Sequence, residues 1–266
     1  MIRVGIGGWV YEPWRGVFYP RGLAQARELE FASRKLTSIE INGTFYGTQK
    51  PASFRRWADE TPDHFVFSLK GPRFATHRRI LGEAGESIER FFASGVVELK
   101  SKLGPVCWQF PPTKAFDEQD FAAFLALLPR QLEGQAIRHA VEVRHASFLD
   151  PGFIGLLRKH SVAPVLVDSD KHPMIADTTA DFVYARLQRT VETLDTGYSP
   201  AALDVWAKRA QVWADGGTPE DLATIAELAA PKARQRRAKR DVFVYMISGA
   251  KVRAPAAAMA LIERLA

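Results

Sequence analysis

The sequence has very little cysteine and no long hydrophobic run. Among its 266 residues Cys107 is the only cysteine, so no internal disulfide can form, as is usual in a reducing cytoplasm. The longest stretch without Asp, Glu, Lys or Arg is 103–113, which is too short to cross a bilayer, and no apolar segment follows the first three residues. We therefore expect a soluble, cytoplasmic protein with no membrane partner.

Several motifs that carry well-defined chemistry are also missing. The segment 5–10, with the sequence GIGGWV, lacks the third glycine of a dinucleotide-binding fingerprint, and no P-loop, paired-histidine zinc helix or nucleophile elbow occurs. Cys107 lies among apolar neighbours, which favours an inert thiol over a nucleophile. The sequence thus predicts no organic cofactor, and a divalent metal stays open as an alternative.

The positive charge is concentrated in one segment. The chain has 36 basic and 30 acidic residues, and six of the basic ones fall within 232–240, where there is no acid. Without this basic strip, 30 basic residues face 30 acidic ones. A solvated loop explains such a strip, and weak binding to a nucleic-acid backbone is the functional alternative. Its members are Lys232, Arg234, Arg236, Arg237, Lys239 and Arg240.

Short strand-like runs alternate with helical patterns along the whole chain. Eight strands are expected, at 3–7, 38–42, 65–70, 106–110, 140–144, 164–168, 182–188 and 242–247. Helices are expected at 23–35, 53–60, 87–102, 118–128, 152–159, 200–213 and 255–265. Eight such units predict a TIM-like (β/α)8 barrel in the α/β class, formed by a single domain over 1–266. A doubly wound sheet is the main competitor, because it shows the same alternation.

One connection is oversized. The segment 216–240 precedes the last strand and contains an expected short helix at 219–228, followed by the basic strip. Because the strip leads into the beginning of a strand, it should lie at the bottom of the barrel, away from an active site.

Polar residues alternate with apolar ones near the carboxyl ends of six expected strands. Apolar side chains must face the surrounding helices, so the polar set should point into the barrel mouth, where active sites of this fold lie. A structural network of ion pairs explains any single pair, but a functional site explains all six strands better. The expected catalytic residues are Glu40, Glu142, Asp168 and His145. The expected substrate-binding residues are Trp9, Asn42, Tyr46, Lys70, His77, Gln109, Arg144 and Arg186.

The histidines and aromatic residues in this set are chosen by position. His77 and His145 follow strand ends and could reach the mouth, although loop histidines are more often surface or capping groups. Trp9 and Tyr46 follow the first two strands and would offer an apolar face with a polar handle to a sugar or a base. His172 is expected to be structural or at the surface.

Motifs in the same order and at similar spacing occur in the YecE-like family, also known as domain of unknown function 72, which this chain resembles over almost its whole length. The resemblance implies a TIM-barrel-like fold and no established reaction. It rests on Gly7-Gly8-Trp9, Tyr11, Trp14-Arg15-Gly16, Phe18-Tyr19-Pro20, Glu40-Ile41-Asn42-Gly43-Thr44-Phe45-Tyr46, Lys70, Thr76-His77, Gln109-Phe110-Pro111-Pro112 and Glu142-Val143-Arg144-His145.

Two segments depart from the family pattern. At the seventh strand an Arg-x-His-Gly pattern is replaced by Arg186-Leu187-Gln188-Arg189, so a histidine is absent. At the eighth a Tyr-Phe-Asn-Asn pattern is replaced by Tyr245-Met246-Ile247-Ser248, which removes two amides. Chemistry that needs these groups is in doubt, and a subfamily with another substrate would also explain the change.

These observations favour an enzyme that acts on a small polar or anionic substrate, phosphorylated or polyhydroxylated. Lys70, Arg144 and Arg186 would anchor the substrate, and Glu40 and Glu142 would form an acid-base pair. The reaction class stays open between hydrolase, lyase and isomerase, and the oligomeric state stays open too.

The second enzyme hypothesis is a divalent-metal-dependent phosphodiesterase or nuclease. It takes Glu40, Glu142, Asp168 and His145 as metal ligands, since carboxylates and imidazole suit Zn, Mn or Mg. The nearby cations speak against this hypothesis, because they would repel a metal ion.

Overall fold

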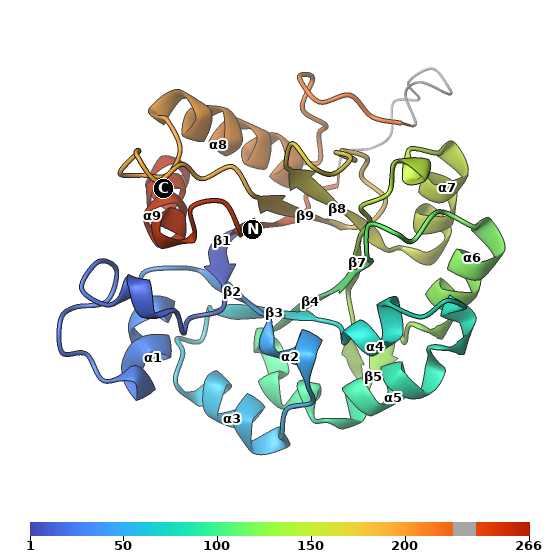
Figure 1. Ribbon diagram of the computed structural model, residues 1–266, viewed down its shortest axis with the longest axis horizontal. Coiled ribbons are helices and arrows are strands. Elements are labelled where there is room, and N and C mark those ends of the chain that lie inside the picture. The colour runs from blue at the N-terminus through green and yellow to red at the C-terminus, as the bar shows by residue number, and fades with distance from the viewer. Residues whose placement is uncertain (226–237) are drawn as a thin grey trace.

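The computed structural model describes residues 1–225 and 238–266 and shows a closed barrel of eight parallel strands (Figure 1). Each expected strand is confirmed, so the TIM-like (β/α)8 class is confirmed and the doubly wound sheet is excluded. The order around the barrel is β1, β10, β9, β8, β7, β4, β3, β2. Their bounds are β1 Ile2–Gly7, β2 Ser38–Ile41, β3 Val66–Lys70, β4 Leu103–Gln109, β7 His139–Glu142, β8 Ala163–Asp168, β9 Phe182–Leu187 and β10 Asp241–Met246.

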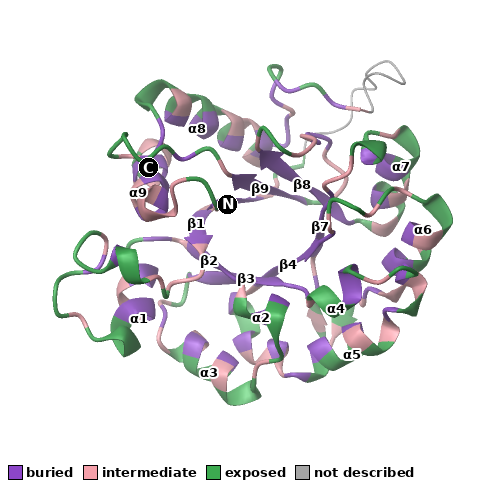
Figure 2. Cartoon of the chain, in the orientation of Figure 1, coloured by how far each residue is buried: buried purple, intermediate pink, exposed green. Residues whose placement is uncertain are grey.

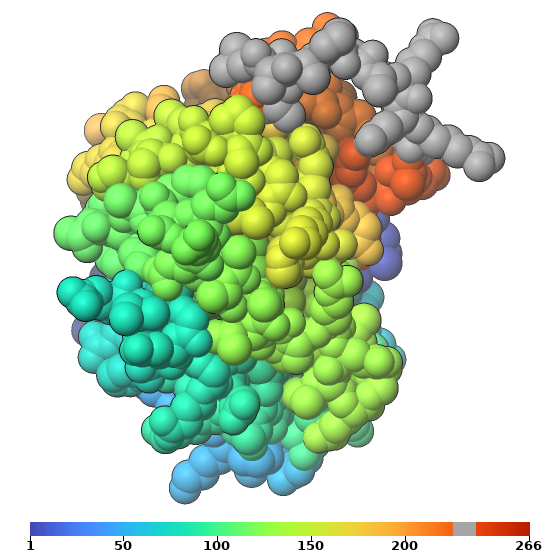
Figure 3. Space-filling view, turned by 90° about the vertical axis from the view of Figure 1, so that its right-hand side faces the viewer, coloured from blue at the N-terminus to red at the C-terminus, as the bar shows by residue number. Residues whose placement is uncertain are grey.

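Helices surround the barrel and bury one face each against it (Figure 2). A two-stranded hairpin, β5 Gln131–Leu132 with β6 Gln135–Ala136, lies outside the barrel sheet. The space-filling view from the side that carries α6 and α7 shows the residues of these helices packed against one another over the barrel (Figure 3). The helix bounds are α1 Glu28–Ser33, α2 Gly43–Tyr46, α3 Pro51–Asp59, α4 Arg73–Thr76, α5 Gly85–Ala93, α6 Glu118–Leu127, α7 Pro151–His160, α8 Pro200–Ala214 and α9 Ala254–Leu265.

Three expected helices differ from the structure. The helix expected at 23–35 is a 3-10 helix, Gln25–Arg27, followed by the short α1. The helix expected at 87–102 divides into α5 and a 3-10 helix, Val96–Lys102, because Gly95 between them adopts a left-handed conformation with φ of 96°. A Cβ at Gly95 would also lie 2.8 Å from Pro51. The short helix expected at 219–228 is wrong over residues 219–225, which form turns and irregular backbone, and its last three residues lie outside the described part.

The barrel interior is filled with side chains below the mouth. Aromatic rings of Phe182, Tyr184, Phe243 and Tyr245 pack there with smaller apolar groups from the other strands. The Tyr245 hydroxyl forms hydrogen bonds with the hydroxyls of Ser38, at 2.7 Å, and Ser68, at 2.6 Å. This packing closes the interior, so a ligand can approach the inward polar groups only from the mouth.

Strand β1 contributes little side-chain volume to the interior. Gly5 faces inward beside Ser38, and a Cβ at this position would lie 1.9 Å from the Ser38 carbonyl oxygen. Only glycine therefore allows β1 and β2 to approach closely enough to close the barrel.

Candidate active site

The strand register decides which side chains share the barrel interior. In a parallel sheet, paired residues on neighbouring strands point to the same side. Glu40 pairs with Ser68, Lys70 with Cys107, and Gln109 with Glu142. Arg186 lies on the same side through its pairs with Tyr245 on β10 and Val167 on β8. The structure therefore brings together five of the expected residues at the mouth: Glu40, Lys70, Gln109, Glu142 and Arg186.

Arg186 bridges the two glutamates. Its Nη2 donates to Glu40 Oε1 at 3.0 Å, and its Nη1 donates to Glu142 Oε2. The Tyr184 hydroxyl also donates to Glu40, at 2.5 Å. Both carboxylates are fully buried, and the guanidinium is 3% exposed, so burial of the charges is tolerable only because each has a partner.

A second chain of contacts runs from Glu142 to Lys70. Gln109 Nε2 donates to Glu142 Oε1 at 2.8 Å, and Lys70 Nζ donates to Gln109 Oε1 at 2.9 Å. Arg144 also donates to Glu142 Oε1, through Nε at 2.8 Å and Nη2 at 2.7 Å. Lys70 Nζ lies 3.8 Å from the centroid of the Phe45 ring, a cation–π contact. Among the described residues, no carboxylate lies within ion-pair distance of Lys70.

These surroundings lower the pKa values of both Glu142 and Lys70, but for different reasons. Burial alone would raise the pKa of Glu142, but the charges of Arg186 and Arg144 and the Gln109 hydrogen bond outweigh it and lower the pKa to about 2. Burial, assisted by the Arg186 charge, lowers the pKa of Lys70. At neutral pH Glu142 is therefore ionised and can accept a proton but cannot supply one, whereas Lys70 releases its proton more easily than an exposed lysine.

His172 is a residue of this region that sequence reasoning missed. It lies between β8 and β9, and burial together with the charge of Arg144 lowers its pKa, while the charge of Glu142 acts against them. Its Nδ1 is buried and has no hydrogen-bond partner. A histidine in an irregular segment has no periodic pattern that would assign it to the mouth.

The other two histidines differ in their surroundings. His77 is exposed and packs against Phe45 with ring centroids 5.7 Å apart, and burial followed by the charges of Arg73, Lys70 and Arg144 lowers its pKa. His145 instead caps a 3-10 helix, Ala146–Phe148, by accepting from the Ser147 backbone N–H at 3.2 Å. The geometry gives His145 the capping role that was the alternative to catalysis.

Asp168 points away from the barrel mouth, contrary to the expectation. Asp168 pairs with Leu187, whereas Val167 pairs with the inward Arg186, so the Asp168 side chain lies outside the barrel wall. There it accepts from Arg189 Nε at 3.1 Å and from the Tyr198 hydroxyl at 3.2 Å. These partners of Asp168 include neither His145 nor the inward glutamates.

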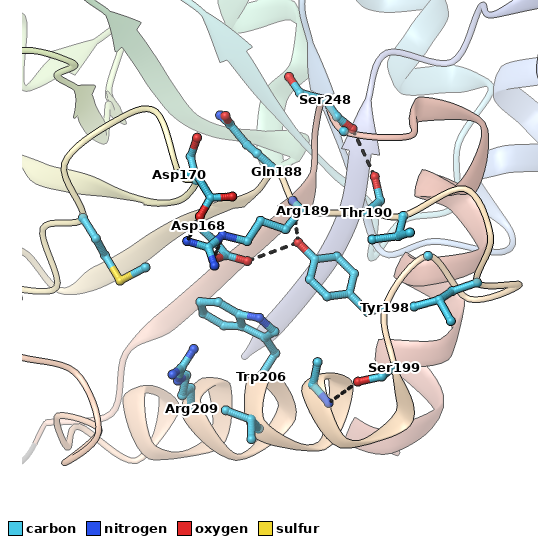
Figure 4. A pocket seen from close by; sticks show the side chains of 18 of the residues that line it. Asp168, Asp170, Gln188, Arg189, Thr190, Tyr198, Ser199, Trp206, Arg209 and Ser248 are labelled. Carbon is cyan, nitrogen blue, oxygen red and sulfur yellow. Dashed lines mark hydrogen bonds and ion pairs between the residues drawn. The ribbon is translucent and has the colours of Figure 1, made fainter.

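The Asp168 cluster lines an open pocket of about 1020 Å³ between β8, β9 and α8 (Figure 4). Gln188 lies at its upper edge, and Trp206 and Arg209 of α8 form the opposite wall, with the Arg209 guanidinium 4.3 Å from the Trp206 ring. Burial raises the pKa of Asp168, and the charge of Arg189 and the Tyr198 hydrogen bond offset only part of this effect.

The remaining expected substrate-binding residues differ in how exposed they are and in what they pack against. Tyr46 is 65% exposed beside the mouth and is free to contact a ligand. Asn42 is half-buried, and its Nδ2 approaches the Glu40 carbonyl oxygen at 3.5 Å. Trp9 is partly buried and packs against the core, with its ring 5.2 Å from that of Trp57, so its role as an aromatic floor for a ligand stays a prediction.

The expected metal ligands are not assembled. Arg186 lies between Glu40 and Glu142, Asp168 lies outside the barrel, and His145 binds Ser147. Within 1–225 and 238–266, no group of three His, Cys, Asp or Glu residues has a geometry suited to a metal ion. The donor set present at the mouth, with three cations around two carboxylates, therefore does not fit the four-ligand site.

The described end of the basic strip lies at the barrel bottom, as expected. Arg240 immediately precedes β10, whose first residues pair with the start of β1. The Arg240 side chain donates to the Gly217 carbonyl oxygen at 3.0 Å. The residues from Lys232 to Arg237 lie outside the described part.

No described helix is both long and apolar enough to span a bilayer.

Known proteins resemble this chain in sequence. UPF0759 protein YunF of Bacillus subtilis strain 168 is 31% identical over 161 residues, covering 58% of this chain and 54% of that protein. UPF0759 protein YecE of Escherichia coli K12 is 28% identical over 155 residues, covering 57% and 52%. The chain thus spans about half the length of the curated relatives it matches.

Solved structures share the fold. A DUF72 family protein of Thermotoga maritima MSB8 superposes with a TM-score of 0.72 at 24% identity, covering 100% of this chain and 99% of that one. SacUVDE superposes with a TM-score of 0.56 at 7% identity, covering 99% of each chain. At these identities the likeness shows the fold alone. The family model described as protein of unknown function DUF72 matches residues 3–266, nearly the whole sequence, and the chain therefore belongs to the DUF72 family.

Proposed function

We propose that the barrel mouth is an active site for a small anionic substrate, such as a phosphorylated or carboxylated metabolite. The observation that carries this proposal is an imbalance of charge. Arg144 and Arg186 neutralise the two buried carboxylates, and Lys70, which is 5% exposed, is left with only a neutral amide and an aromatic ring. A buried ammonium without a counter-anion is costly, and an anionic group of the substrate would supply one.

In this proposal the mouth residues have three roles: anion binding, positioning of the cations, and proton transfer. Lys70 and Arg144 hold the anionic group, because both can still reach a ligand, while Arg186 is committed to both glutamates. The glutamates fix the cations in place. His172 lies on the loop that follows β8 at the carboxyl end of the barrel, and its Nδ1 is buried without a hydrogen-bond partner. Because the pKa of Lys70 is also lowered, we assign proton transfer at the bound substrate to these two groups. Proton transfer beside a bound anion suits a hydrolase, a lyase or an isomerase.

The binding half of this proposal is tested by thermal unfolding in the presence of inorganic phosphate and of a panel of sugar phosphates and dicarboxylates. We expect ligands of this class to raise the Tm of the wild type, since a ligand that binds only the folded state stabilises it. Lys70→Met should abolish the increase. Lys159→Met is the matched control, because Lys159 is exposed in the last turn of α7, which leads into the beginning of β8 at the bottom of the barrel. An unchanged increase in Lys70→Met would refute the proposal.

The catalytic half is tested on the substrate that the panel identifies. His172→Asn should lower kcat by about 100-fold, a typical value for loss of a general acid or base, and should leave the ligand-induced increase in Tm intact. Turnover unaffected by His172→Asn would exclude His172 as the proton carrier.

A further inference from the structure

We propose that an exposed surface beside the mouth binds single-stranded nucleic acid. This surface, the α2–α4 rim, consists of Tyr46, Arg73, Phe74, His77 and Arg78. Two of its aromatic rings face solvent, since Tyr46 is 65% exposed and Phe74 is 58% exposed. The inference goes beyond the proposed function and does not depend on which small anion the mouth takes.

The two rings and a cation form one unit. The Arg73 guanidinium lies 5.5 Å from the centroid of the Phe74 ring and 6.0 Å from that of the Tyr46 ring, so the rings flank the same charge. Phe74 also lines two neighbouring hollows, of about 270 and 450 Å³. Exposed aromatic rings next to guanidinium groups bind unstacked bases and the phosphates between them, whereas duplex bases are already stacked and hidden.

The charge of the rim is not neutralised by the protein. Residues 64–82 contain Lys70, Arg73, Arg78 and Arg79 and no Asp or Glu. In the described part of the chain, no carboxylate lies within ion-pair distance of Arg73, Arg78 or Arg79. Arg78 is held in place through neutral groups, with its Nε donating to the Phe74 carbonyl oxygen and its Nη2 to Ser87 Oγ, both at 3.1 Å. A phosphate backbone would provide the missing negative charge.

The rim continues into the mouth through Phe45. The His77 ring packs 5.7 Å from the Phe45 ring, and Lys70 Nζ lies 3.8 Å from the centroid of the same ring. One buried phenyl group thus joins the mouth cation Lys70 to the rim. A strand lying on the rim would have cations along its path from Arg78 to Lys70.

The test measures binding of fluorescein-labelled dT12, U12 and a 12-base-pair duplex by fluorescence anisotropy at several salt concentrations. We expect the wild type to bind the single strands at least tenfold more tightly than the duplex. Phe74→Ala and Tyr46→Ala should each weaken single-strand binding by about tenfold, the size expected for loss of one stacked base. Arg73→Gln should reduce the slope of log K against log salt by about 0.7, as for one phosphate contact.

Two controls separate the rim from other sites. Leu149→Ala replaces another exposed apolar residue, 50% exposed and on the loop after β7, and should change affinity less than twofold. Replacing Arg234, Arg236, Arg237 and Lys239 by Gln tests the basic strip and should also leave single-strand affinity within twofold. Equal affinity for the duplex, full binding by Phe74→Ala and Tyr46→Ala, or loss of binding only in the strip variant would overturn the proposal.

The two sets of measurements can show separately whether the rim proposal or the proposed function of the mouth is wrong. Phe74→Ala should retain the phosphate-induced increase in Tm, because Phe74 is 58% exposed on the rim, against Arg73, and is not one of the mouth residues. If that increase is absent from the wild type but the single-strand preference and its loss in the rim variants remain, only the proposed function of the mouth is wrong.

Discussion

Two charged clusters lie at the carboxyl ends of neighbouring parts of the barrel, on opposite sides of its wall. The inner cluster joins Glu40 and Glu142 through Arg186, and all three are almost completely shielded from water. The outer cluster joins Asp168 to Arg189, which is 46% exposed, and to Tyr198 (Figure 4). A carboxylate at the end of a barrel strand therefore need not belong to the mouth.

The difference comes from strand register and has consequences for the pKa values. Glu142 shares the inner side with Gln109, while Asp168 shares the outer side with Leu187. Two guanidiniums lower the pKa of Glu142, but burial prevails at Asp168 and raises its pKa, because its cationic partner is largely in water. All the inner charges are shielded from water and depend on one another, whereas in the outer cluster the Arg189 guanidinium can be solvated.

Removal of the central cation should break the inner cluster most strongly. Arg186→Met leaves two buried carboxylates with one cation fewer, and loss of one partner of a buried pair typically costs about 3–5 kcal/mol. Urea unfolding at pH 7 should show a destabilisation of this size. The matched change in the outer cluster, Arg189→Met, should cost less than about 1 kcal/mol, because Arg189 is 46% exposed and Asp168 keeps its hydrogen bond from Tyr198. Equal losses in the two variants would contradict the distinction between the clusters.

The two carboxyl groups should also give opposite dependence of stability on pH. The pKa of Glu142 in the folded state, about 2, lies below its unfolded value near 4.3, so its stabilisation is complete above about pH 4.3 and is lost as the pH falls toward 2. The folded pKa of Asp168 lies above its unfolded value near 3.9, so its contribution is complete below that pH and is lost as the pH rises through the folded value.

Urea unfolding between pH 3 and pH 6 can separate these effects. Glu142→Gln should flatten the increase of the free energy of unfolding with pH, by an amount on the order of 3 kcal/mol over the full titration. Asp168→Asn should make the increase steeper, by a smaller amount. If both variants change the slope in the same direction, the assigned surroundings of one carboxylate are wrong.

The tyrosines offer a finer comparison. The Tyr184 hydroxyl donates a hydrogen bond to Glu40 inside the barrel. Tyr184→Phe removes this hydrogen bond and should lower the free energy of unfolding by about 2 kcal/mol, since the acceptor is charged and buried. Tyr198 donates to Asp168, and Tyr198→Phe should cost about 1 kcal/mol, because Arg189 and water can compensate. Thermal unfolding at pH 7 measures both. A larger loss for Tyr198→Phe would reverse the ranking of the clusters.

Much of the fold follows from alternation in the sequence. In 38–42 and 67–70, polar and apolar residues alternate, so both the strand and its inward face can be predicted from the sequence. The strand 163–168 differs, because every residue before Asp168 is apolar and no alternation reveals which face is inward. Strands buried on both faces have this ambiguity, and the inward assignment of Asp168 was wrong for that reason.

Loop residues of the candidate site were predicted less well. Glu40, Lys70, Gln109, Glu142 and Arg186 were found through strand parity, and the structure brings them together. Trp9 and His172 lie outside regular strands, where sequence spacing does not define direction. Their places depend on tertiary contacts, with Trp57 for Trp9 and with the Arg144 charge for His172.

The location of a bound oxyanion tests the central claim most directly. Crystals soaked in tungstate, a heavy analogue of phosphate, would reveal anion sites by anomalous scattering. We predict the strongest peak at the barrel mouth, within hydrogen-bond distance of Lys70 Nζ and next to Arg144, and its loss in Lys70→Met. A strongest peak beside Arg189 in the outer pocket, with none at Lys70, would contradict the assignment of the mouth as the anion site.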